Sequence, residues 1–403
     1  SLLLGTFFVA SGVLTQNREG STISLPNSDD GRKKKALELF GDSVNTSNPL
    51  DSFYYPDRYS RNFPPYYTTV TQKREDVDSL MRDLWDNLQT LKNSETVIGP
   101  LLADFSARAK IIYCYNMIDF ALGLWQNGDG VVRVSKSYEM SKSVELLIQS
   151  HETLHGIHAA TGLINGDFSL PIGEYQKNVL MYEASAIVLE NLVGLEFMLD
   201  GDFGPLQGCI ARDLSLNAEI LRAWNEAIGS GLPYKEALAV TGEAGIYFQL
   251  KSQWWLDAYN TSIFFTFLET MNSGLLPPVS DKTYSLESAR MTGYLSPDFN
   301  FTAGLDSLPS SGALCGNNPG MRNAFDYLEY QRMVYSYGEN DARTTAIRRV
   351  LEKKENPYID LSPADILRNN ALAGVKISPD NLMDLMLKGV DFKNSKLIFE
   401  PTP

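Results

Sequence analysis

The three histidines of this chain all fall within eight consecutive residues, 151–158. The first five of these read His-Glu-Thr-Leu-His, so His151 and His155 stand four positions apart and Glu152 follows the first. On an α-helix, side chains at this spacing lie about 40° apart around the axis and about 6 Å apart along it, so both imidazoles can turn toward one ion. Glu152 falls on the flank of the pair, where its carboxylate can accept a proton from a metal-bound water. The pattern predicts a zinc site with Glu152 as general base.

The residues before the motif predict that it lies on a helix. Met140, Val144, Leu147 and Ile148 follow the apolar rhythm of a helix, and the histidines continue the same stripe. Imidazoles that face an interior need partners, and two on one face need a common partner. The alternative is a pair of core histidines satisfied by ordinary hydrogen bonds.

A catalytic zinc site needs a third protein ligand and one open position. Residues 173–200 predict a second, largely apolar helix with Glu183 near its middle. An ionised carboxylate on so apolar a helix is costly unless it meets a charge or a metal. Glu183 is therefore the predicted third ligand, and Glu190, two turns further along the same face, is its rival.

The set His151, Glu152, His155 and Glu183 resembles the gluzincin branch of the HExxH zinc metallopeptidases, represented by thermolysin-like enzymes. The resemblance implies a zincin-like core and hydrolysis of peptide bonds. Members commonly carry an aspartate four residues after the ligand glutamate, which orients a histidine; here that position is Ile187. The residue that orients a histidine is therefore unassigned.

Two other metal sites use related patterns. Peptide deformylase binds its metal with the same five-residue HExxH motif and an upstream cysteine. Here Cys114 precedes His151 by 37 residues. The surrounding residues 111–119 are apolar and aromatic and lack the Gly-Cys-Leu context of that family, so Cys114 is predicted to be a small core residue. A di-iron centre would need a second Glu-x-x-His pair, and no histidine remains to supply it.

Three further side chains are candidates for the chemistry. His158 lies about 10 Å along the helix from His151, too far to share its ion unless the helix breaks. It could donate to a developing oxyanion, contact a substrate carboxylate or cap the helix end. Tyr182 and Tyr175 compete for the role of phenolic donor. We expect His158 and Tyr182 to assist Glu152.

The composition limits the partners. The formal net charge of −14 disfavours nucleic acid and anionic membranes. Three widely spaced cysteines give no disulfide framework and no cysteine-based zinc module. No apolar run reaches the roughly 18 residues that a membrane span needs.

The chain divides into three predicted parts. Residues 1–65 are expected to wrap the domain, with the apolar first fourteen residues either a buried segment or the remnant of a signal. Residues 66–205 form the zincin-like catalytic core, which begins with an amphipathic helix from Arg74 to Leu91. Residues 206–403 form a helical part that closes the cleft. The fold class is mostly α, of the α+β type, with a short β-sheet or hairpin.

Residues 124–135 predict two short strands joined by a turn at 127–130. In HExxH enzymes an edge strand just upstream of the motif pairs with an extended substrate, and this hairpin is predicted either to do so or to be a plain surface hairpin. Beyond residue 205, helices are predicted at 213–228, 245–271 and 324–337. Residues 273–323 are predicted to form a long loop at the rim of the active site or between domains. Helix starts are predicted at the Ser-Pro pairs of 361–370 and 377–386.

These observations favour zinc-dependent hydrolysis of peptide bonds in a protein or peptide substrate. Two alternatives belong to other classes. One is a metal-dependent hydrolase of a non-peptide amide or ester, which would share the ligands. The other is a non-catalytic binding or structural protein that retains the metal motif.

Overall fold

The computed structural model describes residues 66–116, 121–126, 130–136, 140–163 and 167–372. Within them the protein is mostly helical with two small sheets, so the predicted fold class is confirmed. The predicted wrapping segment 1–65 and the second Ser-Pro helix start at 377–386 lie outside the described residues.

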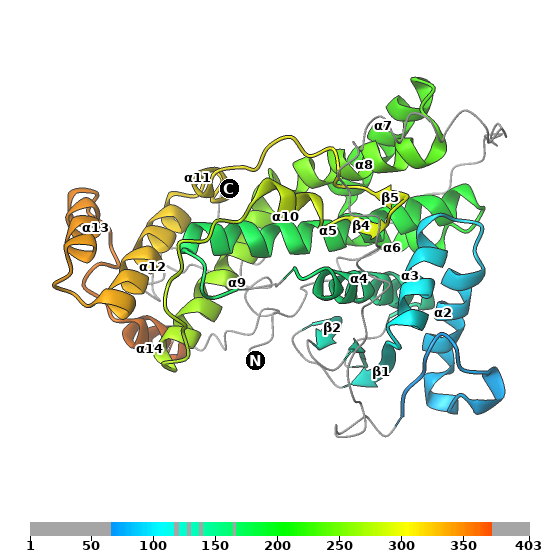
Figure 1. Ribbon diagram of the computed structural model, residues 1–403, viewed down its shortest axis with the longest axis horizontal. Helices are drawn as coiled ribbons and strands as arrows, with labels where there is room; N and C mark the ends of the chain where they lie inside the picture. Colours follow the sequence, from blue (N-terminus) through cyan, green and yellow to red (C-terminus); the bar gives the residue numbers. More distant parts are fainter. Residues whose placement is uncertain (1–65, 117–120, 127–129, 137–139, 164–166, 373–403) are drawn as a thin grey trace.

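Two long helices form the centre of the molecule. Helix α4 (Lys142–Ala160) begins where the Ser141 hydroxyl accepts a hydrogen bond from the Val144 amide at 3.3 Å. Helix α5 (Ile172–Leu199) is 28 residues long, starts after Pro171, and is buried along nearly its whole length. A helix that is apolar on all sides belongs in the interior. The two helices pack against each other (Figure 1), as the sequence predicts.

A three-stranded sheet lies beside α4. Its strands are β1 (Ile112–Asn116), β2 (Gly123–Gln126) and β3 (Val131–Ser135) in the order β1-β3-β2, with β1 parallel and β2 antiparallel to β3. The predicted strand pair is confirmed as β2 and β3. Strand β1 is a third strand that the sequence analysis does not predict. Strand β2 forms an edge of this sheet and packs on α4.

The N-terminal helical region differs from its prediction. In place of one helix from Arg74, two 3₁₀ turns (η2, Arg74–Asp76, and η3, Ser79–Met81) precede α2 (Arg82–Asn93). Val77 is extended, and the Asp78 carboxylate accepts a hydrogen bond from the Leu80 amide at 2.8 Å, which favours a fresh helix start over a continuous helix. Helix α3 (Ile98–Arg108) follows.

Three helices after α5 are predicted from the sequence and confirmed: α7 (Leu214–Gly229), α12 (Pro319–Tyr337) and α14 (Pro363–Leu372). The sequence analysis does not predict α6 (Gly204–Arg212) or α13 (Ala342–Lys353), and α8 (Tyr234–Gln249) and α9 (Gln253–Asn272) stand where it predicts one helix. The single helix predicted at 245–271 is wrong, because the chain leaves the helix at residues 250–252. There Ser252 is extended, so α8 and α9 are separate helices.

The predicted loop at 273–323 carries regular structure. It contains α10 (Leu286–Arg290), the strand pair β4 (Tyr294–Ser296) and β5 (Phe299–Asn300), and α11 (Ser311–Leu314). These short elements pack on α3, α4, α5 and α8, so the segment covers the central helices rather than standing apart from them.

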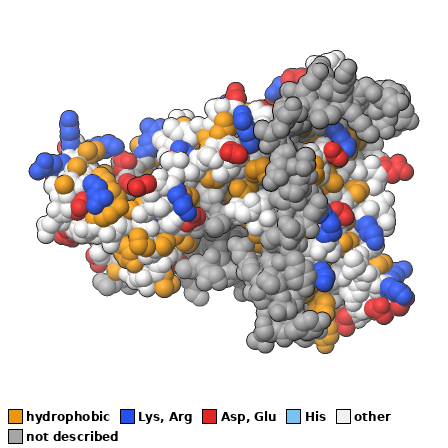
Figure 2. All heavy atoms as spheres, viewed as in Figure 1, with side chains coloured by type: hydrophobic (Ala, Val, Ile, Leu, Met, Phe, Trp, Pro, Cys, Tyr) orange, Lys and Arg blue, Asp and Glu red, His pale blue; other side chains and the backbone are white. Residues whose placement is uncertain are grey.

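One buried apolar cluster extends from Val70 to Ile366. The predicted boundary at 205/206 therefore does not separate two cores among the described residues. On the face in Figure 2, basic and acidic side chains are interspersed. No helix in the described part of the chain has the length and apolar character needed to cross a membrane.

Candidate metal centre

His151, His155 and Glu183 come together between α4 and α5. The Nε2 atoms of the two histidines lie 3.0 Å apart. Each carboxylate oxygen of Glu183 lies 3.7 Å from one of these nitrogens, Oε2 from His151 and Oε1 from His155. All three residues are buried. Three potential ligand atoms thus face a common point inside the protein.

The spacing of these atoms fits a metal ion. With zinc–ligand distances of about 2.0–2.1 Å and tetrahedral geometry, ligand atoms lie about 3.3 Å from each other. The observed separations of 3.0 and 3.7 Å differ from that edge by a few tenths of an ångström. Two imidazoles and one carboxylate are also the donor types of catalytic zinc sites. The group can therefore hold a metal ion.

The protonation of the histidines agrees with this role. Burial lowers the pKa of both His151 and His155 well below the ordinary imidazole value, so both rings are neutral at neutral pH. A neutral imidazole has one nitrogen with a free lone pair, which is the form that binds a metal.

Glu190 lies on the far side of His151 from Glu183. Its Oε1 is 2.5 Å from Nδ1 of His151, and its Oε2 forms an ion pair with Arg212 at the end of α6. Burial lowers the pKa of Arg212 to about 9, so this arginine is charged at neutral pH. The geometry thus favours Glu183 over its rival Glu190 as third ligand. Glu190 contacts the outer nitrogen of His151, which is where a residue that orients a ligand histidine would lie. Ile187, at the position of the usual aspartate, is a buried core residue.

The Glu152 side chain lies next to strand β2. A Cβ atom added at Gly123 of β2 would lie 2.8 Å from Oε1 of Glu152 and 2.4 Å from Cγ2 of Ile148. The missing side chain of Gly123 therefore gives the Glu152 carboxylate its place between α4 and the edge strand. Gly156 of α4 leaves room for Trp125 of β2 in the same way, because a Cβ at Gly156 would lie 2.9 Å from the Trp125 ring.

The two tyrosine candidates occupy different places. The Tyr182 ring stacks on the His155 ring with centroids 4.6 Å apart and an angle of 7° between the planes, and its hydroxyl donates to the His155 carbonyl at 3.2 Å. Tyr175 packs between Phe168 and Phe267, two turns before Glu183 on α5. Only Tyr182 of the two lies at the site, and its hydroxyl is engaged by the backbone.

His158 connects α4 to the covering segment. Its Nε2 lies 2.6 Å from the Thr292 carbonyl oxygen and 3.5 Å from the Ser185 hydroxyl. Since a carbonyl only accepts, Nε2 donates, and burial lowers the pKa of this imidazole to about 3. Helix α4 continues past Gly156 to Ala160, so His158 stays outside the ligand group, as its spacing predicts.

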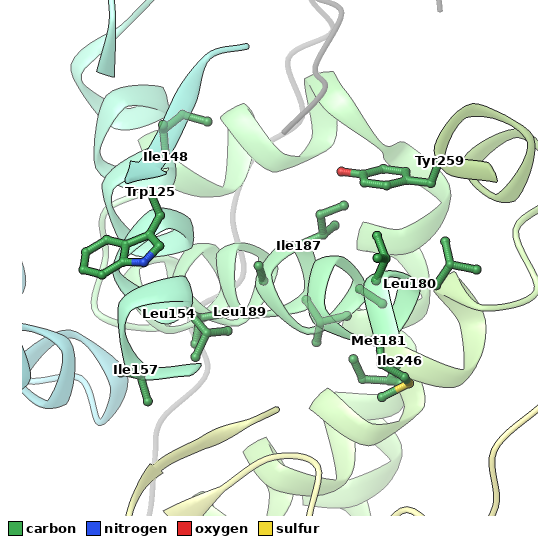
Figure 3. Close-up of a cluster of buried hydrophobic side chains, with 14 of the residues drawn as sticks. Trp125, Ile148, Leu154, Ile157, Leu180, Met181, Ile187, Leu189, Ile246 and Tyr259 are labelled. Carbon is green, nitrogen blue, oxygen red and sulfur yellow. The ribbon is translucent and has the colours of Figure 1, made fainter. Parts of the chain in front are cut away.

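Arg212 and Tyr259 are neighbours of the site that the sequence analysis did not identify. The Tyr259 hydroxyl, on α9, lies 3.5 Å from Oε2 of Glu183. Figure 3 shows this hydroxyl pointing toward α5, and Trp125 packed against α4. A basic residue at the end of an apolar helix is the one signal that points to Arg212. For Tyr259, among 20 tyrosines, the sequence holds no signal.

Comparisons with protein-family models, curated proteins and solved structures find no match for this chain. Cys114, weighed as an alternative ligand, lies buried in β1 next to Arg133 and outside the metal-binding group, as predicted.

Proposed function

We propose that this protein is a zinc-dependent metallopeptidase whose ion is held by His151, His155 and Glu183. The observation that carries the proposal is the convergence of these three ligand groups, with Glu152 next to His151 along α4. Each residue matches the gluzincin pattern in type and order along the chain. When bound, zinc would supply a Lewis acid that polarises a carbonyl and acidifies water.

The protein's own groups prepare the site in two ways. Burial lowers the pKa of both imidazoles, which keeps them in the neutral form that can bind a metal. The Tyr182 ring fixes the His155 ring by stacking on it. These contacts hold the donors in place before any ligand arrives, which lowers the cost of assembling the site.

Glu152 is the proposed general base. Glu152 is 1% exposed, and its carboxylate lies next to Gly123 of β2. It would accept a proton from the attacking water and pass it to the leaving amine.

Strand β2 favours a peptide as substrate. It is an edge strand beside Glu152, and the described residues pair with only one of its two sides. An extended peptide can add to such an edge through main-chain hydrogen bonds. A peptide bound there would place a scissile bond near Glu152.

The burial of the site favours a second candidate, a structural metal site. His151 is 0% exposed and Glu183 is 2% exposed, whereas a catalytic site must admit substrate. A structural ion would tie α4 to α5 without any turnover. Hydrolysis of a non-peptide amide or ester is a third candidate that shares all the ligands.

The deciding experiment compares Glu152→Gln with wild type. We expect zinc-loaded wild type to cleave casein or a mixed peptide library, and Glu152→Gln to keep its zinc and lose about 100-fold or more in rate. The matched control is Glu145→Gln, another buried carboxylate on α4, which contacts Tyr115 and Lys136. Zinc binding without cleavage of peptides or of simple ester and amide substrates would favour the structural site.

A further inference from the structure

A buried ion pair lies behind the ligand His151. Glu190 of α5 and Arg212 of α6 pair directly, with side chains 0% and 8% exposed. Removing two charges from water costs free energy that their mutual attraction often does not repay. The pair therefore contributes little to stability by itself, and its contact with His151 suggests another use.

That contact determines which nitrogen of His151 carries the proton. A neutral imidazole has one N–H group and one nitrogen with a lone pair. Nδ1 lies 2.5 Å from Oε1 of Glu190, and because an ionised carboxylate only accepts, Nδ1 must be the donor. Nε2 is then left with its lone pair, and Nε2 is the atom that faces His155 and Glu183.

We propose that Glu190, held in place by Arg212, is a positioning residue that fixes the tautomer and ring orientation of His151 for binding a divalent cation. This inference rests on the proposed metal site, though not on peptidase activity. A carboxylate on the outer nitrogen makes a ligating imidazole a stronger donor, and losing such a partner typically weakens metal binding about 10- to 100-fold.

The charges of the site support a divalent cation. Glu152, Glu183 and Glu190 are each at most 2% exposed. Counted by formal charge, these three carboxylates and the Arg212 guanidinium sum to −2, which one divalent ion would cancel. Arg212 also compensates Glu190, so that Glu190 can remain a hydrogen-bond acceptor without adding to the net charge around the ion.

Histidine-selective ¹⁵N NMR tests the tautomer directly, because the chain has only three histidines. In the metal-free wild type, we expect His151 as the Nδ1–H tautomer. We expect His158, whose Nε2 donates to Thr292, as the Nε2–H tautomer. Replacing Glu190 with Gln or Ala should redistribute the His151 tautomers and leave His158 unchanged as an internal reference. An unchanged His151 spectrum in both variants would overturn the proposal.

Zinc and cobalt affinities, measured by chelator competition and by the cobalt absorption spectrum, test the consequence. We expect Glu190→Gln to bind about 10- to 100-fold more weakly than wild type. Because this variant removes the Glu190 charge that faces Arg212, the double variant Glu190→Gln/Arg212→Gln removes both charges and keeps the local net charge constant. The control is Glu196→Gln, which removes a buried carboxylate of α5 that caps α3 through Val97 and Ile98.

The outcomes separate the inference from the proposed function. A weakened double variant with an unaffected Glu196→Gln supports the positioning role. Wild-type affinity in the double variant overturns it and leaves the metal site standing, provided that Glu183→Ala still abolishes binding. A wild type that binds neither metal removes both the inference and the proposed function.

Discussion

The Nε2 atoms of His151 and His155 lie 3.0 Å apart inside a helix pair, with the Glu183 carboxylate bridging them. Two neutral imidazoles at this distance can share one proton in a hydrogen bond or direct both lone pairs at a cation. Because Glu190 engages Nδ1 of His151, Nε2 of His151 accepts in the first case and binds the ion in the second. The same geometry therefore serves both the metal-free and the metal-bound protein.

The first prediction concerns metal content and stability. We expect about one zinc ion per wild-type chain, and strong chelation should lower the melting temperature, because an ion at about 1,000 times its dissociation constant stabilises the folded state by about 4 kcal/mol. His155→Ala should lose both the zinc and the chelator response. His158→Gln should retain both, since His158 lies outside the ligand group. Elemental analysis and thermal melts measure these quantities, and equal zinc in both variants would contradict the assignment.

A second prediction concerns the space left by Gly123. A Cβ there would meet Oε1 of Glu152 at 2.8 Å and Ile148 at 2.4 Å, so Gly123→Ala must displace the carboxylate. A shift of about 1 Å in a catalytic group can cost about 100-fold in rate, so we expect a loss of that order with zinc affinity within about twofold of wild type. Gly229→Ala is the matched control, because its Cβ would meet no atom within 4 Å. Equal rates for the two variants would remove Glu152 from the mechanism.

The central helices and the grouping of His151, His155 and Glu183 could be predicted because their signals are local. Both histidines stand on one helix, so their spacing fixes their relation before any tertiary contact forms. Glu183 is distinguished by being a charge on an apolar helix. The start of α14 at Pro363 follows from a capping preference that depends on neighbouring residues alone.

The missed features depend on contacts between distant segments. Arg212 lies on α6 and Tyr259 on α9. The sequences of these helices do not indicate that they pack beside the metal-binding group. Strand β1 escaped prediction because a short apolar run such as 111–115 is compatible with a buried strand or a buried helix segment. The break between α8 and α9 at 250–252 was missed because apolar residues continue on both sides of it.

A third prediction concerns the role of Tyr182. Its hydroxyl donates to the His155 carbonyl, so Tyr182→Phe should lose one hydrogen bond, worth about 1 kcal/mol, and keep the stacked ring and near-normal turnover. Tyr182→Ala should lose about 3–5 kcal/mol of stability, as other buried aromatic truncations do, and weaken zinc binding. Tyr175→Phe is the control, because the Tyr175 hydroxyl has no hydrogen-bond partner among the described residues. A 100-fold fall in the rate of Tyr182→Phe would instead identify its phenol as the donor to the substrate.

The last prediction concerns acid. Burial holds the pKa of His158 at about 3, whereas an unfolded histidine titrates near 6.5. The unfolded chain therefore binds the extra proton below about pH 6.5, so the stability from this group is complete above that pH and declines as the pH falls toward 3. The dependence of the unfolding free energy on pH reaches about 1.4 kcal/mol per pH unit.

His158→Gln can still donate to Thr292 but cannot titrate. Its stability, measured by urea unfolding, should therefore fall less steeply between pH 6 and 4 than that of wild type. Ser185→Ala removes a non-titrating neighbour of His158 and should keep the wild-type slope. Parallel curves for wild type and His158→Gln would show that His158 is protonated in the folded protein.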